Sequence, residues 1–215
     1  MRLHWLLLVC STVVSAQSFE ASISGGRTVI PAKNAVLGTY TADPASGDVK
    51  ADGGFRLNLR MTLNQWRFFG HEFGYSYTHA SVQLPASSLA SGGGGIGPTQ
   101  PIGITTNLPA NVISMPAHQG YYDFLAYAAP EGFRVRPFVA AGVQFTAFSQ
   151  PTSYYYSRET RYGVNYGGGL KIKVLENWGM RFDVRQYNMS KPFSLPNASG
   201  RFIMWEFGGG ISFLM

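Results

Sequence analysis

Apolar and polar residues alternate with a period of two along much of this chain. The segment FRLNLRMTL, residues 55–63, is an example: its odd-numbered positions are apolar and its even-numbered positions carry arginine, asparagine or threonine. Successive side chains of a β-strand point to opposite faces, so this pattern predicts strands with one apolar face. Because no stretch beyond the N-terminal segment shows a convincing helical period, the sequence predicts an all-β fold class.

The alternation predicts eight strands, at about residues 18–26, 54–63, 67–80, 119–128, 135–148, 161–174, 179–189 and 201–214. The connections between them are alternately long and short, beginning with a long one. This is typical of a transmembrane barrel, which has short turns at one end and longer loops at the other. The sequence therefore predicts an eight-stranded antiparallel up-and-down transmembrane β-barrel. Since the strand number is even, both termini should lie at the short-turn, periplasmic end.

The position of the charges separates this fold from a soluble sandwich. A sandwich turns its apolar face inward, whereas a membrane barrel turns that face to lipid and its polar face to the lumen. A lipid-facing Arg or Lys would cost about 2–4 kcal/mol near the bilayer midplane. We therefore predict an interior charge network in which acids and bases pair, plugging the lumen. The predicted network consists of Glu20, Arg56, Arg60, Glu72, Asp123, Arg136, Lys171, Lys173, Arg181, Asp183, Arg185 and Glu206.

The N-terminus has the features of a secretory signal peptide. Arg2 and His4 precede an apolar stretch, and Val14-Ser15-Ala16 resembles a cleavage site. We predict a signal peptide at 1–16 and a barrel domain at 17–215. The only cysteine, Cys10, lies in the signal peptide, so no disulfide is expected. The net charge is +6, but the cations are scattered, which argues against a nucleic-acid groove.

Aromatic residues are predicted to form a belt at each membrane interface. Trp178 and Phe213 lie beside the predicted short turns, and Tyr121, Tyr122 and Tyr162 are assigned to the long-loop end.

The C-terminal residues WEFGGGISFLM resemble the last strand of bacterial outer-membrane barrels, with Phe207, Ile211 and Phe213 on one face. The chain departs from that pattern in ending on Met215, where Phe is more usual. Segments 136–148, 166–174 and 180–189 are similar to the strands of small OmpA-like or OmpX-like barrels, and the likeness extends over about 18–215. The resemblance implies a bacterial outer-membrane location, surrounding outer-membrane lipid, and recognition of the last strand by the barrel-assembly machinery.

Motifs for metal, nucleotide or cofactor binding are missing from the sequence, so no cofactor and no metal site is expected. His79 and Ser81 form an H-x-S pair that resembles the one in outer-membrane lipid A deacylases, although the sequence offers no obvious acid for a catalytic relay. The leading hypothesis is a non-enzymatic barrel, porin-like, structural or binding an unidentified ligand through its surface loops. A lipid A hydrolase and a narrow pore are the alternatives.

Overall fold

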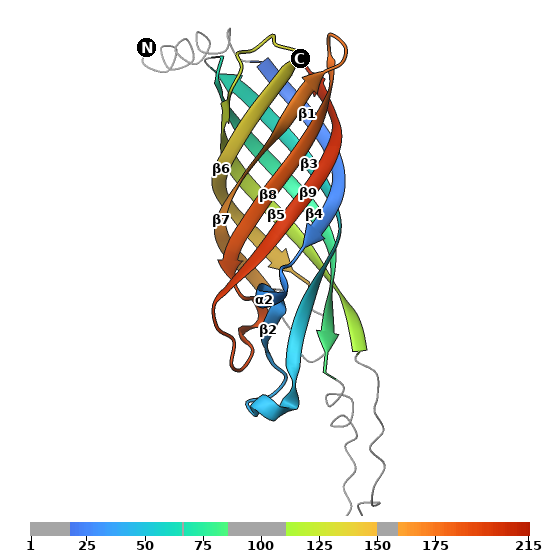
Figure 1. The fold of residues 1–215 in the computed structure, drawn as a ribbon, viewed down its shortest axis with the longest axis vertical. Coiled ribbons are helices and arrows are strands. Elements are labelled where there is room, and N and C mark those ends of the chain that lie inside the picture. The colour runs from blue at the N-terminus through green and yellow to red at the C-terminus, as the bar shows by residue number, and fades with distance from the viewer. Residues whose placement is uncertain (1–17, 66, 86–110, 150–158) are drawn as a thin grey trace, which may run out of the picture.

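The computed structural model describes residues 18–65, 67–85, 111–149 and 159–215. Its wall is built from eight long antiparallel strands, which wind around one axis (Figure 1). They are β1 (Ser18–Val29), β3 (Asp48–Gln65), β4 (Phe69–Leu84), β5 (Asn111–Tyr127), β6 (Val135–Phe148), β7 (Glu159–Lys173), β8 (Trp178–Ser190) and β9 (Arg201–Leu214). Within the described part of the chain, no helix is long and apolar enough to span a membrane.

The first strand closes the wall into a cylinder. β1 pairs with β3 on one side and with β9 on the other, so that Ile23 lies opposite both Leu59 and Ile211. The other long strands pair with their neighbours in sequence. The predicted eight-stranded antiparallel barrel is therefore confirmed. Closure leaves no open edge along the shared length of the wall, which satisfies the backbone groups of every strand.

Two strands have the predicted bounds, and others are longer than predicted. β6 and β9 span 135–148 and 201–214 as expected, whereas β3 begins at Asp48 and β5 at Asn111. The first long connection also contains a short strand, β2 (Val36–Thr39), which pairs with β3. A single helical turn, α2 (Ala32–Ala35), precedes it, and 3-10 turns lie at Pro44–Ser46 (η2) and Pro192–Ser194 (η3).

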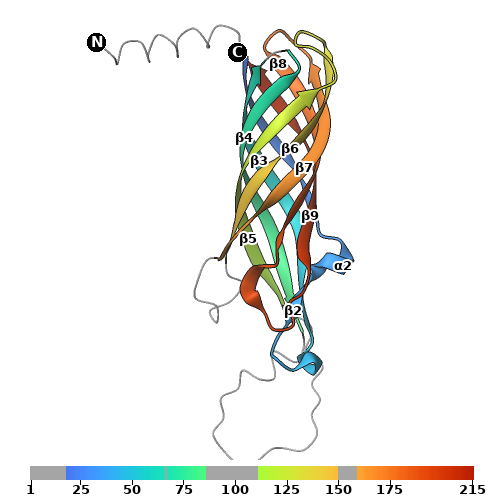
Figure 2. The same ribbon diagram turned by 90° about the vertical axis from the view of Figure 1, so that its left-hand side faces the viewer.

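The two ends of the cylinder differ. The C-terminus and the short β5–β6 and β7–β8 connections lie at one end, and α2, β2 and the other irregular segments lie at the opposite, long-loop end (Figures 1 and 2). The predicted signal peptide, residues 1–16, falls outside the described residues.

The outer face of the barrel is apolar over most of its height. Leu59, Val143 and Phe182 point outward and are 48%, 59% and 45% exposed. Such exposure of large apolar side chains would be unfavourable in water, and it is the property expected of a lipid-facing surface.

The interior of the long-loop end is apolar, and here the prediction of a polar lumen was wrong. A cluster of buried side chains, here called the apolar layer, fills this end: Ile30, Leu37, Val49, Ala51, Ala80, Val82, Met115, Ala117, Phe148, Tyr187, Met189, Phe193, Leu195, Phe202 and Met204. The outward neighbours of these residues on β3 and β4 are polar, for example Lys50 and Ser81. Along these strands the apolar side chains thus change from the outer face to the inner face. This is expected where the barrel wall leaves lipid and enters water.

Candidate functional site: the charged barrel interior

Eight of the twelve predicted network residues form one layer inside the barrel. This charged layer consists of Arg56, Arg60, Glu72, Asp123, Arg181, Asp183, Arg185 and Glu206, each no more than 3% exposed. They come from β3, β4, β5, β8 and β9, at inward positions of the alternating pattern. The four arginines balance the four carboxylates, so the layer has no formal net charge. A buried charge without a partner is costly, so the balance is a condition for burying the layer at all.

Glu72 pairs with three of the four arginines, as Asp183 also does. Its Oε2 lies 2.5 Å from Arg181 Nη1, and its Oε1 lies 2.6 Å from Arg185 Nη2. Arg60 Nε is 3.7 Å from Oε1, and the Thr62 hydroxyl donates to Oε2 at 2.9 Å. One side chain of β4 thereby joins β3 to β8 across the lumen.

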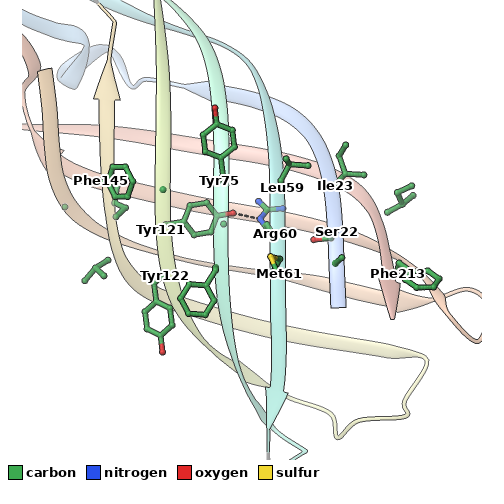
Figure 3. Close-up of a pocket in the computed structure, with 18 of the residues that line it drawn as sticks. Ser22, Ile23, Leu59, Arg60, Met61, Tyr75, Tyr121, Tyr122, Phe145 and Phe213 are labelled. Carbon is green, nitrogen blue, oxygen red and sulfur yellow. Dashed lines mark hydrogen bonds between the residues drawn. The ribbon is translucent and has the colours of Figure 1, made fainter. Parts of the chain in front are cut away.

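Among the bases, Arg60 likewise bonds to several partners. It donates to Glu206 Oε1 at 2.8 Å and to Asp183 Oδ2 at 3.2 Å. Its Nε donates to the Tyr121 hydroxyl at 2.6 Å, the bond drawn in Figure 3, and its Nη1 donates to Ser24 at 2.6 Å. The guanidinium therefore donates to acceptors on four strands and is held in one orientation.

The remaining members complete the layer. Arg56 pairs with Glu206 at 3.1 Å, Arg181 Nη2 pairs with Asp183 at 2.9 Å, and Arg185 pairs with Asp123. Charge-assisted bonds of this kind are about twice as strong as neutral ones, and the low dielectric of the interior strengthens them further. The layer is thus a cross-linked plug rather than a set of charges lining open water.

The other four predicted residues lie toward the short-turn end. Lys171 donates to Glu20 at 2.6 Å and to the Tyr127 hydroxyl at 3.1 Å. Arg136 lies over the Tyr127 ring at 3.8 Å. Lys173 is only half-buried and has no carboxylate partner among the described residues. All four line a 270 Å³ pocket at this mouth of the barrel.

Two tyrosines belong to the network and were not predicted as members. Tyr121, assigned from sequence to an interface belt, points inward and is 5% exposed, so that assignment was wrong. In Figure 3 its neighbour Tyr122 points away from it. Tyr187 donates to Glu206 Oε2 at 2.6 Å, and Arg56 Cζ lies 4.5 Å from the centre of its ring. The alternation along the strands could have predicted both tyrosines as members, because Tyr121 shares a face with Asp123 and Tyr187 shares a face with Arg185.

His79 and Ser81 lie on the outer face of β4, and the structure does not arrange them as a relay. His79 is exposed and Ser81 half-buried, and neither has a hydrogen bond to another described side chain. Asp52 lies opposite Ser81 in the β3–β4 register, and its carboxylate accepts from the Gly53 N–H. A relay requires the acid to orient the histidine, whereas here the carboxylate lies beside the serine strand position.

An aromatic pair marks the short-turn end of the outer face, as predicted. The rings of Trp178 and Phe213 pack edge to face with their centres 5.1 Å apart. A closed cylinder with an apolar exterior, interfacial aromatics and a neutralised charged interior is a transmembrane β-barrel.

The chain belongs to the outer membrane protein β-barrel domain family, whose model matches residues 6–213. This family places the protein in the bacterial outer membrane. Among curated proteins, none matches the chain significantly.

Solved structures of small outer-membrane barrels share the fold. OprG from Pseudomonas aeruginosa matches with a TM-score of 0.62 and 12% identity, over 93% of this chain and 96% of that one. The N-terminal barrel of OprF from Pseudomonas aeruginosa gives a TM-score of 0.53 and 13% identity, over 92% and 97%. Neisserial surface protein A gives 0.52 and 12%, over 93% and 97%. At these identities the likeness is one of fold.

Proposed function

We propose that this protein is a non-enzymatic, non-conducting outer-membrane barrel that acts through its stability and its surface loops. The observation that supports the proposal is the charged layer: four arginines and four carboxylates from opposite walls pair with one another across the lumen. An eight-stranded barrel has an interior just wide enough for side chains. An ion crossing it would have to displace paired guanidinium groups.

The apolar layer is a second seal. Phe148 packs against Phe193 of η3 and Phe202 of β9, with ring centres 6.1 and 6.0 Å apart. A hydrated ion entering from the long-loop end would first have to lose its water among these rings. Two seals in series favour a closed barrel over a narrow pore.

The same proposal gives the orientation of the barrel. The termini and short turns face the periplasm, and the long connections face the outside, as is usual for bacterial barrels of even strand number. Loops on a rigid scaffold are a common place for binding.

Planar-bilayer recording tests the proposal directly. Purified wild-type protein, inserted in a bilayer, should give no steady conductance. Steady channels whose ion selectivity changes in Arg56→Gln or Arg181→Gln would overturn it in favour of a narrow pore. Shortening of lipid A by the purified protein, lost in Ser81→Ala, would overturn it in favour of a hydrolase.

We also propose that the barrel-assembly machinery recognises β9 through its outward Phe207, Ile211 and Phe213. Phe213→Ser should slow insertion into vesicles that contain the machinery, and it should leave unassisted refolding in detergent much less affected. Phe145→Ser is the control, since Phe145 is also an outward phenylalanine but lies on β6. Equal slowing by both substitutions would argue against recognition of the last strand.

A further inference from the structure

The outer face has a sharp polar boundary where β8, β9 and β1 lie side by side. On β8, outward Phe182 and Val184 are followed by Gln186 and Asn188. Gln186 lies opposite Trp205 of β9 in the register, and Trp205 lies opposite Val29 of β1. Tryptophan is enriched at membrane interfaces, where its ring and N–H meet apolar and polar surroundings. The lipid-facing surface therefore ends at about this line.

Three exposed cations of β1, α2 and β9 lie close to this boundary or beyond it. Arg27 is the outward residue of β1 opposite Phe207, the last apolar position of β9 before Trp205. Lys33 lies on α2, which projects from the wall at the long-loop end (Figure 2). Asn34 of α2 donates to the Arg201 carbonyl at 3.1 Å, so the turn that carries Lys33 lies against the start of β9. We call Arg27, Lys33 and Arg201 the cationic seam.

The cationic seam is not neutralised by the protein. None of its members forms an ion pair with a described residue, and Arg201 Nη1 donates to the neutral Asn188 amide oxygen at 3.3 Å. Asp52, the exposed carboxylate nearest to Arg27 by register, accepts from its neighbouring N–H, and Glu206, which is nearer, is buried inside the barrel. By contrast, Arg161, also at the long-loop end, is paired with Glu159.

We propose that the cationic seam binds the phosphate groups of phosphorylated lipids in the leaflet around the long-loop end. A lipid phosphate lies just outside the hydrocarbon region, at the depth marked by Gln186 and Trp205. Arg27 can reach that depth from the last apolar position by extending its charged group away from the hydrocarbon. The forked donors of Arg27 and Arg201 match phosphate oxygens.

The length of the seam fits a lipid with more than one phosphate. Arg201 lies six positions beyond Phe207 along β9, about 20 Å at the usual strand rise. Arg27 therefore forms a lower contact, and Lys33 with Arg201 an upper one. Phosphate binding by the cationic seam requires only that the barrel lies in the membrane, and it does not depend on whether the barrel conducts.

Native mass spectrometry of the refolded protein in detergent tests this inference. The probes are bis-phosphorylated lipid A and the same lipid after enzymatic removal of its phosphates. Wild type should retain the phosphorylated form at least about tenfold better, since each cation near an anionic lipid surface contributes favourably. The variant Arg27→Gln/Lys33→Gln/Arg201→Gln should lose most of that preference.

A matched control removes the same charge from the opposite end of the barrel. Arg67→Gln/Arg134→Gln/Lys173→Gln should keep the preference of wild type, and heat-modifiable gel mobility establishes that each variant is folded. The proposal fails if wild type shows no preference for phosphorylated lipid, if the seam variant keeps it, or if both variants lose it equally. Bilayer conductance is a separate readout, so failure here is distinguishable from failure of the proposed function.

Discussion

Single residues in the barrel interior contribute unusually strongly to the free energy of unfolding. Glu72 is completely buried and pairs closely with Arg181 and Arg185, so its loss would leave two guanidinium groups without that counter-charge. Breaking a buried ion pair from one side costs more than the pair itself contributes, because the remaining charge stays desolvated.

Glu72→Gln should therefore lower the free energy of unfolding by about 3–5 kcal/mol. The measurement is urea-induced unfolding of the protein in detergent or lipid, followed by gel mobility. Glu176→Gln, at the exposed β7–β8 turn, is the matched control and should change stability by about 1 kcal/mol or less. Similar effects of both substitutions would mean that the charged layer does not stabilise the barrel.

Gly74 permits the close packing of Tyr121 on the wall. A Cβ at Gly74 would lie 2.0 Å from Tyr121 Cζ, whereas a Cβ at outward Gly25 would come no closer than 3.7 Å to the Phe55 ring. Gly74→Ala should displace the ring that bonds Arg60 and destabilise the barrel by about 1–3 kcal/mol, as overpacking usually does. Gly25→Ala, compared in the same unfolding assay, should be nearly neutral. A neutral Gly74→Ala would show that the ring can move freely.

At the scale of the strand, the exchange of the apolar face marks the depth of the membrane. Along β8 the outward residues change from Phe182 and Val184 to Gln186 and Asn188, while Met189 points inward into the apolar layer. One strand therefore follows the membrane pattern over its first part and the soluble pattern over its last.

This change of face predicts that an outward arginine destabilises the barrel much more at one position of β8 than at another. Phe182→Arg should cost at least about 2–4 kcal/mol, the usual cost of a cation near the bilayer midplane. Asn188→Arg should cost less than about 1 kcal/mol, since it lies beyond the boundary. Reversible unfolding from lipid vesicles measures both. An equal cost would place Asn188 within the lipid.

The change of the apolar side chains from the outer to the inner face also explains which strand bounds could be predicted from the sequence. β9 was predicted because its outward positions from Trp205 to Phe213 are apolar except for Gly209, while the positions between them are polar or glycine. The first half of β5 was missed because apolar Met115 points inward there, while Ser114 and Pro116 occupy outward positions. The interior face of Arg60 and Glu72 followed from parity alone. Their pairing with each other did not, because the tilt and stagger of the strands decide which residues meet across the lumen.

At the scale of the whole molecule, two layers close the lumen of the barrel, one ionic and one apolar. Each spans the lumen at a different height, since the charged layer draws on mid-strand residues such as Arg60 and the apolar layer includes Leu37 of β2 and Phe193 of η3. Removing one seal should leave the other in place.

Conductance should therefore appear only when both layers are opened. Arg60→Ser/Glu206→Ser alone and Phe202→Ser alone should stay silent in planar bilayers, and their combination should conduct. Folding of each variant is checked by heat-modifiable mobility. Channels from either partial variant would show that the two seals do not act independently.

The closure of the cylinder through β1 has a kinetic consequence. Ile23 of β1 lies opposite both Leu59 and Ile211, so closing the cylinder pairs a strand near the N-terminus with the strand at the C-terminus. No intermediate can complete the ring before the last strand arrives, and contacts this distant in sequence form slowly. Until then the unpaired edge strands of the incomplete sheet would readily pair with other chains. A newly exported molecule therefore needs a chaperone that prevents its aggregation.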